Sequence, residues 1–314
     1  MALPLLRDCR AGDAPARRRR LALPTLRDSL PAYAAAKHIK ASSLKRYQSI
    51  LNTHFSEWLD QSVTAMKTPA FGEHCHEFAQ SKGAALVEVG RGLIGALIKY
   101  LNAVHSQTIR NPFGRLADAG LMPERAQPRA RRLKEIDMPV WRSAVEKLPE
   151  RQHDYLLLIA MTGLRRNECS NIRKQQVDFA DRVLHIPETK NGKPHTLPIT
   201  PMMEPILARR CVDLEDDDLV FAGVSAEHVA EMASRVGAPK FMLHDLRKLL
   251  ATTGERLAVG DAVLRRILNH TAQRADVLHR HYVSLSAADI TEPLMAIQRE
   301  LENLMAIGKL PTSV

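Results

Sequence analysis

Short fragments that carry reactive side chains follow one another across the second half of the chain, and they constrain its fold more than any other feature. The residues concerned are Arg165, Lys190, His244, Arg247, His270 and Tyr282. They lie in T-G-L-R-R-N-E, T-K-N-G-K, H-D-L-R, L-N-H and R-H-Y-V, in that order. Each fragment alone is common in unrelated proteins, but chance assembly of the whole ordered set is implausible. The chain is therefore expected to bring these side chains into one site.

The size and charge of the chain indicate two domains and a polyanionic partner. With 314 residues, it is long enough for two ordinary domains that each bury a core. Its formal net charge is +10, and such an excess of Lys and Arg favours nucleic acid, because neutralising phosphates releases counterions. Charge alone does not distinguish DNA from RNA.

The cysteines and the hydropathy pattern argue against metal, disulfide and membrane proteins. The cysteines are far apart and form no C-x-x-C pair, so neither a zinc site nor a disulfide framework is predicted. His74 and His76 flank Cys75, but adjacent residues on a helix point in different directions, and no metal is expected there. No run approaches the roughly 20 apolar residues of a membrane span. A soluble protein of the reducing cytoplasm is expected.

The N-terminal segment, residues 1–28, is predicted to be a flexible basic tail. Within it, A-L-P-L-L-R-D at 2–8 recurs as A-L-P-T-L-R-D at 22–28, with four arginines at 17–20 between the copies. Two copies do not make a repeat protein. The arginines are interpreted as phosphate contacts or as having no specific role.

Residues 29–121 show a helical pattern and are predicted to form a first domain. Ser42 or Ser43 is expected to cap a helix that continues to Trp58, with apolar residues every three or four positions. A second apolar helix is expected to stop at Asn111-Pro112.

Residues 122–135 are predicted to be an extended basic linker. They combine two prolines with clustered positive charge and show no apolar periodicity. We place the domain boundary there, and the second domain at 136–285.

The second domain is predicted to be mainly α with a small antiparallel β-sheet. The segment from Trp141 to Met161 is interpreted as two helices, and Gly163 ends the second because glycine tolerates the turn that stops a helix. Further helices are predicted at 201–210, 225–234, 241–256, 261–268 and 286–307.

One hairpin is predicted inside this helical pattern. Strands at 183–187 and 195–199 flank Asn191-Gly192, which is a strong signal for a tight turn. Lys190 is therefore expected at the hairpin tip or its shoulder.

Together, the fragments resemble the tyrosine recombinases, the family of phage and genomic-island integrases. The resemblance covers roughly residues 135–285 with specific motifs, and 29–110 only by general character. It implies a helical core-binding domain at 29–121 and an α+β catalytic domain at 136–285. The implied function is a site-specific recombinase or integrase of a mobile element, which cuts and rejoins DNA through a 3′-phosphotyrosine. No metal, ATP or other cofactor is implied.

The resemblance also implies how phosphate is attacked and held. Tyr282 would be the nucleophile, and it is the only tyrosine after His270. Arg165 and Arg247 would bind the two non-bridging oxygens through paired bonds that strengthen as negative charge accumulates.

The remaining residues of the motifs would move protons or support the arginines. Lys190 would protonate the leaving 5′ oxygen. His244 would orient or deprotonate the tyrosine, and His270 would hydrogen-bond phosphate. Glu168 would hold a guanidinium in place.

Two features depart from the family's pattern. The usual L-G-H is L-N-H at 268–270, and Tyr282 lies a few positions further past His270 than in many relatives. His279 and His281 are therefore minor alternatives to His270, although neither follows an L-x-H context.

Two other functions remain open. Type IB topoisomerases share this chemistry, but their second-arginine motif usually begins with lysine, where this chain has His244. Relaxation of plasmids without paired sites would favour that class. A catalytically silent DNA-binding protein of the same fold would be expected to lack the nucleophile or an arginine, and neither is missing.

The implied partners are double-stranded DNA with specific recombination sites, further copies of the chain in a tetrameric synapse, and accessory DNA-bending proteins. The final segment, 286–314, carries an apolar stripe that packs within its own domain or docks into a neighbouring protomer. The resemblance favours docking in trans. A cytoplasmic, nucleoid-associated location follows from the DNA partner and from the lack of an apolar signal core.

Overall fold

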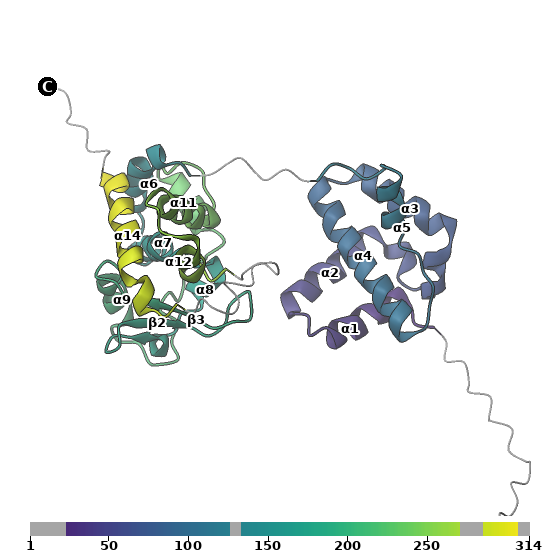
Figure 1. Cartoon of the computed structure of the whole chain (residues 1–314), viewed down its shortest axis with the longest axis horizontal. Helices are drawn as coiled ribbons and strands as arrows, with labels where there is room; N and C mark the ends of the chain where they lie inside the picture. The colour runs from purple at the N-terminus through teal and green to yellow at the C-terminus, as the bar shows by residue number, and fades with distance from the viewer. Residues whose placement is uncertain (1–22, 126–132, 271–284, 307–314) are drawn as a thin grey trace, which may run out of the picture. The chain divides into compact units, whose positions relative to one another are not determined.

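The computed structural model describes residues 23–125, 133–270 and 285–306 (Figure 1). The chain divides into two compact units, Met1–Pro128 and Arg129–Val314. Each unit buries its own hydrophobic core. None of the described helices is both long and apolar enough to cross a membrane.

The N-terminal unit is helical. Its elements are α1 (Leu26–Ala36), α2 (Ala41–His54), η1 (Ser56–Trp58), η2 (Val63–Lys67), α3 (Pro69–Ser81), α4 (Ala84–Val104) and α5 (Pro112–Asp118). An aromatic cluster lies at its centre, where the Phe55 ring packs against Phe71 and Phe78 at centroid distances of 6.3 and 5.2 Å. The helical prediction for this segment is confirmed.

The helix boundaries of this unit differ from the predictions. Helix α2 begins at Ala41 after Lys40, so the predicted serine cap at Ser42 or Ser43 is wrong. The apolar stretch that was expected to reach Trp58 breaks at Phe55 and continues as the separate 3₁₀ turn η1.

Side-chain caps explain two other differences. Thr25 caps α1 through a capping box with Asp28, so the last residues of the predicted flexible segment 1–28 are helical. Helix α4 ends at Val104, before the predicted stop, and the Asn111 side chain accepts from the Phe113 N–H to begin α5. The Asn-Pro pair therefore starts a helix.

The C-terminal unit is mainly helical, with one small sheet at its edge (Figure 1). Its elements are η3 (Glu135–Asp137), α6 (Met138–Val145), α7 (Glu150–Thr162), α8 (Arg166–Ser170), η4 (Lys174–Gln176), β1 (Val177–Asp178), β2 (Val183–Ile186), β3 (His195–Pro198), α9 (Glu204–Cys211), α10 (Val229–Arg235), α11 (Leu243–Arg256), α12 (Asp261–Ile267), η5 (Ala288–Ile290) and α14 (Thr291–Ala306). The strands run antiparallel in the order β1-β2-β3, with Leu184 opposite Leu197. The predicted fold class is confirmed; strand β1 was not predicted.

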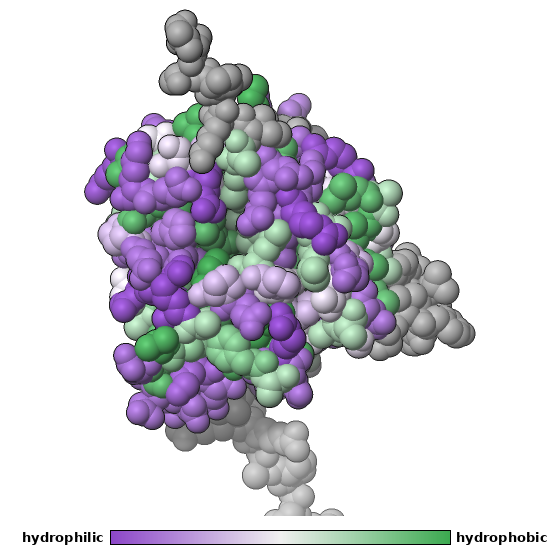
Figure 2. Space-filling model, turned by 90° about the vertical axis from the view of Figure 1, so that its left-hand side faces the viewer, coloured by the Kyte–Doolittle hydropathy of each residue, from purple (hydrophilic) through white to green (hydrophobic). Residues whose placement is uncertain are grey.

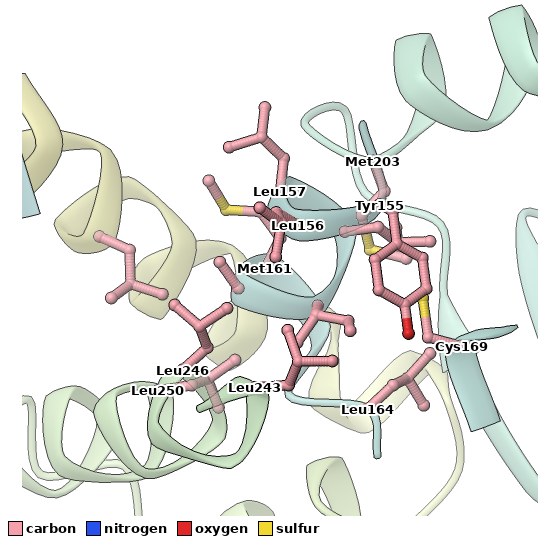
Figure 3. Packing of buried hydrophobic residues seen from close by; sticks show 14 of the residues in the cluster. Tyr155, Leu156, Leu157, Met161, Leu164, Cys169, Met203, Leu243, Leu246 and Leu250 are labelled. Carbon is pink, nitrogen blue, oxygen red and sulfur yellow. The ribbon is translucent and has the colours of Figure 1, made fainter. Parts of the chain in front are cut away.

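Helix α7 forms the centre of this unit. Every residue from Asp154 to Thr162 is buried, because neighbouring elements surround the helix. Figure 3 shows Leu246 and Leu250 of α11 directed toward α7. Truncating a buried leucine of this kind costs about 2–5 kcal/mol of stability. This packing fixes α11, which carries His244 and Arg247, against the helix whose end leads to Arg165.

Helix α14 packs within its own unit in the described chain. Docking in trans requires a neighbouring protomer and stays a prediction. The apolar stripe of α14 is buried, and Gln298 donates to the Met161 carbonyl at 2.9 Å and accepts from the Thr200 hydroxyl at 2.7 Å. The surface on this side of the molecule mixes hydrophilic residues with small hydrophobic patches (Figure 2). Within the single described chain, the stripe is covered by the unit's own core.

Candidate active site

Arg165 stands directly after a turn that only glycine fits well. Gly163 ends α7 at φ +63°, and a Cβ there would meet Leu268 Cδ2 at 2.9 Å. Arg165 follows as the N-cap of α8, where its Nη1 donates to Glu168 Oε1 at 2.8 Å and its backbone N–H donates to Oε2 at 3.0 Å. One carboxylate therefore fixes both the backbone and the guanidinium of this arginine.

Glu168 stays ionised although it is buried. Burial raises the pKa of its carboxyl, but the Arg165 backbone bond and the Arg165 guanidinium outweigh that effect, so the pKa lies below its usual value. A buried negative charge beside Arg165 limits the directions in which the guanidinium can turn, as expected for a supporting residue.

Arg247 is held by backbone carbonyls and is only 4% exposed. It lies on α11, and its two terminal nitrogens donate to the carbonyls of Gly163 and Leu268. Burial, followed by the positive charge of Arg165, lowers its pKa to about 10. The guanidinium is thus still charged at neutral pH, and it connects the end of α7 to the end of α12.

His244 precedes Arg247 on the same face of α11, because residues three apart on a helix are neighbours. Helix α11 begins there since Asp245 accepts a hydrogen bond from the Met242 N–H at 2.9 Å. Partial burial, followed by the charges of Lys248 and Arg247, lowers the pKa of His244 below its ordinary value. Its imidazole is therefore neutral at pH 7 and can accept a proton.

The charges of the same two arginines also act on His270. It follows Asn269, whose φ of +47° turns the chain at the end of α12. Partial burial, then Arg247, Arg165 and His244, lowers the pKa of His270. Because the charges of both arginines act on His244 and on His270, these four side chains lie close enough to interact electrostatically.

Lys190 lies in a longer loop than the predicted tight turn. The last strand pair is Ile186 with His195, because Pro187 and Pro194 cannot extend the ladder. Asn191-Gly192 is consequently not a two-residue hairpin turn, and that prediction is wrong. The exposed Lys190 is placed at the site by its backbone N–H, which lies 3.5 Å from Glu168 Oε1.

Comparison with known proteins shows the family of this chain. Residues 132–287 match the model of the phage integrase family. The chain belongs to the phage integrase family of tyrosine recombinases. No curated protein matches the chain significantly.

Solved integrase structures share the fold of this family member. A lambda integrase dimer bound to a COC′ core site matches with a TM-score of 0.61 at 18% identity, covering 84% of this chain and 99% of that one. A lambda integrase tetramer bound to a Holliday junction matches at 0.60 and 18% identity, over 86% and 82% of the chains. The Tn1549 transposon integrase in complex with circular intermediate DNA matches at 0.59 and 13% identity, over 84% and 97%.

Three residues of the sequence prediction fall outside the described structure. Tyr282, His279 and His281 lie in 271–284, which is not among the described residues. In the parts of the chain that are described, no group of three or more His, Cys, Asp or Glu side chains could hold a metal ion.

Sequence reasoning missed a polar cluster beside the site. Buried His195 and the partly buried Arg266 connect β3 to α12. A histidine at a strand start and an arginine on an amphipathic helix carry no sequence signal that would reveal this contact.

Proposed function

We propose that this integrase is a site-specific DNA recombinase that cleaves and rejoins strands through a 3′-phosphotyrosine, without metal or ATP. One observation carries the proposal. Two fixed guanidiniums, Arg165 and Arg247, interact electrostatically with each other and with His244 and His270. Such a cluster of positive charge suits a phosphodiester whose negative charge increases in the transition state.

The proposed cleavage step forms one bond and breaks one. The phenolic oxygen of Tyr282 attacks the scissile phosphorus, and the bond from phosphorus to the 5′ oxygen breaks. Arg165 and Arg247 bind the non-bridging oxygens, where guanidinium groups offer paired donors that lysine does not.

Two proton transfers accompany this step. His244 accepts the phenolic proton, which its lowered pKa permits at neutral pH. Lys190 donates a proton to the departing 5′ oxygen, and His270 donates a hydrogen bond to the phosphate. Every proton that leaves the nucleophile or joins the leaving group therefore has a named partner.

Rejoining is the reverse reaction with a different strand. The phosphotyrosine retains an ester bond, so a 5′-hydroxyl can attack it and release Tyr282 without an external energy source. This accounts for recombination without ATP.

The proposed partners are duplex DNA with specific sites and further copies of the chain. The net charge of +10 supports phosphate binding. The related lambda integrase structures are a dimer bound to a core site and a tetramer bound to a Holliday junction. By that likeness, we infer a tetrameric synapse here, with accessory DNA-bending proteins, a mobile-element origin and a cytoplasmic, nucleoid-associated location.

The test is covalent trapping on nicked suicide duplexes drawn from the flanks of the gene. The parent protein is expected to form an SDS-resistant adduct with DNA, and Tyr282→Phe is expected to form none while still binding. Equal amounts of adduct from the two proteins would rule out the proposed nucleophile.

A further inference from the structure

One arginine outside the motifs joins three segments around the site. Arg266, on α12, donates through Nη1 to the Thr196 carbonyl at 2.8 Å and through Nη2 to the Thr196 hydroxyl at 2.8 Å. Its Nε donates to the Leu285 carbonyl at 2.7 Å. The guanidinium therefore attaches strand β3 of the Lys190 hairpin to the helix that leads to His270.

His195 completes this attachment from within the core. It is 4% exposed, its Nε2 lies 3.1 Å from the Ile267 carbonyl, and its Nδ1 lies 3.2 Å from Arg266 Nη1. A guanidinium only donates and a carbonyl only accepts, so Nδ1 must accept and Nε2 must donate. The neutral imidazole thus provides a second bond between β3 and α12.

The loop of the hairpin contacts the same turn at a separate point. Asn191 Nδ2 donates to the Asn269 carbonyl, and Asn269 Nδ2 donates to the Lys193 carbonyl at 3.4 Å. Asparagine tolerates the left-handed φ of +47° found at this position. The asparagine that replaces the family's usual glycine therefore keeps the turn and adds a donor to the hairpin.

We propose that Arg266 and Asn191 are positioning residues for the proton donor. This inference rests on the proposed function, in which Lys190 protonates the 5′ oxygen. Lys190 directly precedes Asn191 on the chain, and the turn to which the hairpin is attached contains Leu268, whose carbonyl binds Arg247. These contacts set the position of the Lys190 backbone, from which its exposed side chain extends, relative to Arg247.

A substrate with sulfur in place of the 5′ bridging oxygen separates this role from a merely structural one. An alkoxide needs a proton as it leaves, whereas a thiolate leaves without one, because thiol pKa values are about 8.5. A defect in proton donation disappears on the sulfur substrate. A defect in phosphate binding, nucleophilic attack or folding does not.

The experiment compares single-turnover cleavage of two nicked duplexes that differ only in this atom, at the phosphate mapped by trapping. Lys190→Ala serves as the reference for a lost proton donor. On the oxygen duplex, Arg266→Gln is expected to slow cleavage by about 10- to 100-fold, since small misplacements of a reacting group have effects of this size. On the sulfur duplex, its rate should return to within about threefold of the parent rate, as for Lys190→Ala.

Arg256→Gln is the matched control, because Arg256 makes comparable bonds to Glu135 and Glu300 in the same unit. It should cleave both duplexes at the parent rate. Asn191→Ala removes only the exposed contact at the loop, so it tests the inference even if Arg266→Gln unfolds. Asn191→Ala should slow cleavage of the oxygen duplex by less than Arg266→Gln does. This defect should also disappear on the sulfur duplex.

Two results would overturn the inference alone: parent-like cleavage of the oxygen duplex by both Arg266→Gln and Asn191→Ala, or a defect that persists on sulfur while Lys190→Ala recovers. Failure of the parent protein to form any adduct would instead overturn the proposed function, and this inference with it.

Discussion

The two cationic parts of the site differ in how the fold holds them. Arg247 is 4% exposed, with both terminal nitrogens bonded to backbone carbonyls, whereas Lys190 is exposed on a loop between two strands. A charge that binds phosphate gains from being fixed before the substrate arrives. A proton donor has to follow a leaving group, and a flexible lysine side chain suits that task.

At Arg247, one side chain therefore serves both stability and catalysis. At Lys190, the side chain serves catalysis alone. Removing a buried donor leaves its acceptors without a hydrogen-bond partner, whereas removing an exposed side chain leaves no buried group unpaired. The following predictions use that difference.

The largest effect is expected for Arg247→Ala. Loss of a guanidinium that stabilises phosphoryl charge lowers the cleavage rate by about 10³–10⁵-fold. The carbonyls of Gly163 and Leu268 also lose their donor, at about 1–3 kcal/mol each. Urea unfolding should show this loss of stability. An unchanged unfolding midpoint would contradict the claim that Arg247 stabilises the fold.

Lys190→Ala should affect chemistry alone. Loss of a general acid slows cleavage by about 10²–10⁴-fold, while stability should stay within about 0.5 kcal/mol of the parent protein, as for other surface substitutions. Single-turnover cleavage and urea unfolding measure the two quantities. A clear drop in stability would show that Lys190 belongs to the fixed part of the site.

Glu168→Gln should give an intermediate result that depends on pH. The weaker hold on Arg165 is expected to slow cleavage by roughly 10-fold or more. The lowered carboxyl pKa stabilises the parent protein above the unfolded value, about 4.3, and this advantage disappears as pH falls through the folded value. Unfolding curves of parent and variant should therefore converge in acid; a constant difference would exclude the ion pair as its cause.

The last prediction concerns only how cleavage depends on pH through His244. Its lowered pKa predicts that kcat/KM falls only below about pH 6.5, since the neutral imidazole is the active form and this ratio reports the free enzyme. A His244→Gln variant should lose this acid limb. An acid limb with its midpoint above pH 6.5 would argue against a neutral His244 in the free protein.

Local signals in the sequence predicted much of this site. Gly163 ends α7 with a left-handed turn, as its residue type indicates, and so places Arg165 at the next helix start. The strand pair around Lys190 was also predicted. The length of the loop was not predicted. The Asn191-Gly192 pair indicates a turn, but the position at which the strands end is set by the flanking prolines.

Contacts between distant segments could not be predicted in the same way. The periodicity of α14 shows an apolar face but not its partners, and the Gln298 bonds to Thr200 and Met161 join residues far apart in the sequence. The contact between Arg266 and Thr196 likewise joins residues 70 positions apart. Such pairings depend on the assembled fold.

The central claim is that Tyr282 attacks a phosphate held by Arg165 and Arg247. The most direct measurement is mass spectrometry of the proteolysed adduct from a nicked suicide duplex. The account predicts that the peptide containing Tyr282 carries the 3′-phosphate end of the cleaved strand through its phenolic oxygen. Attachment to any other residue, or a 5′-linked adduct, would contradict it.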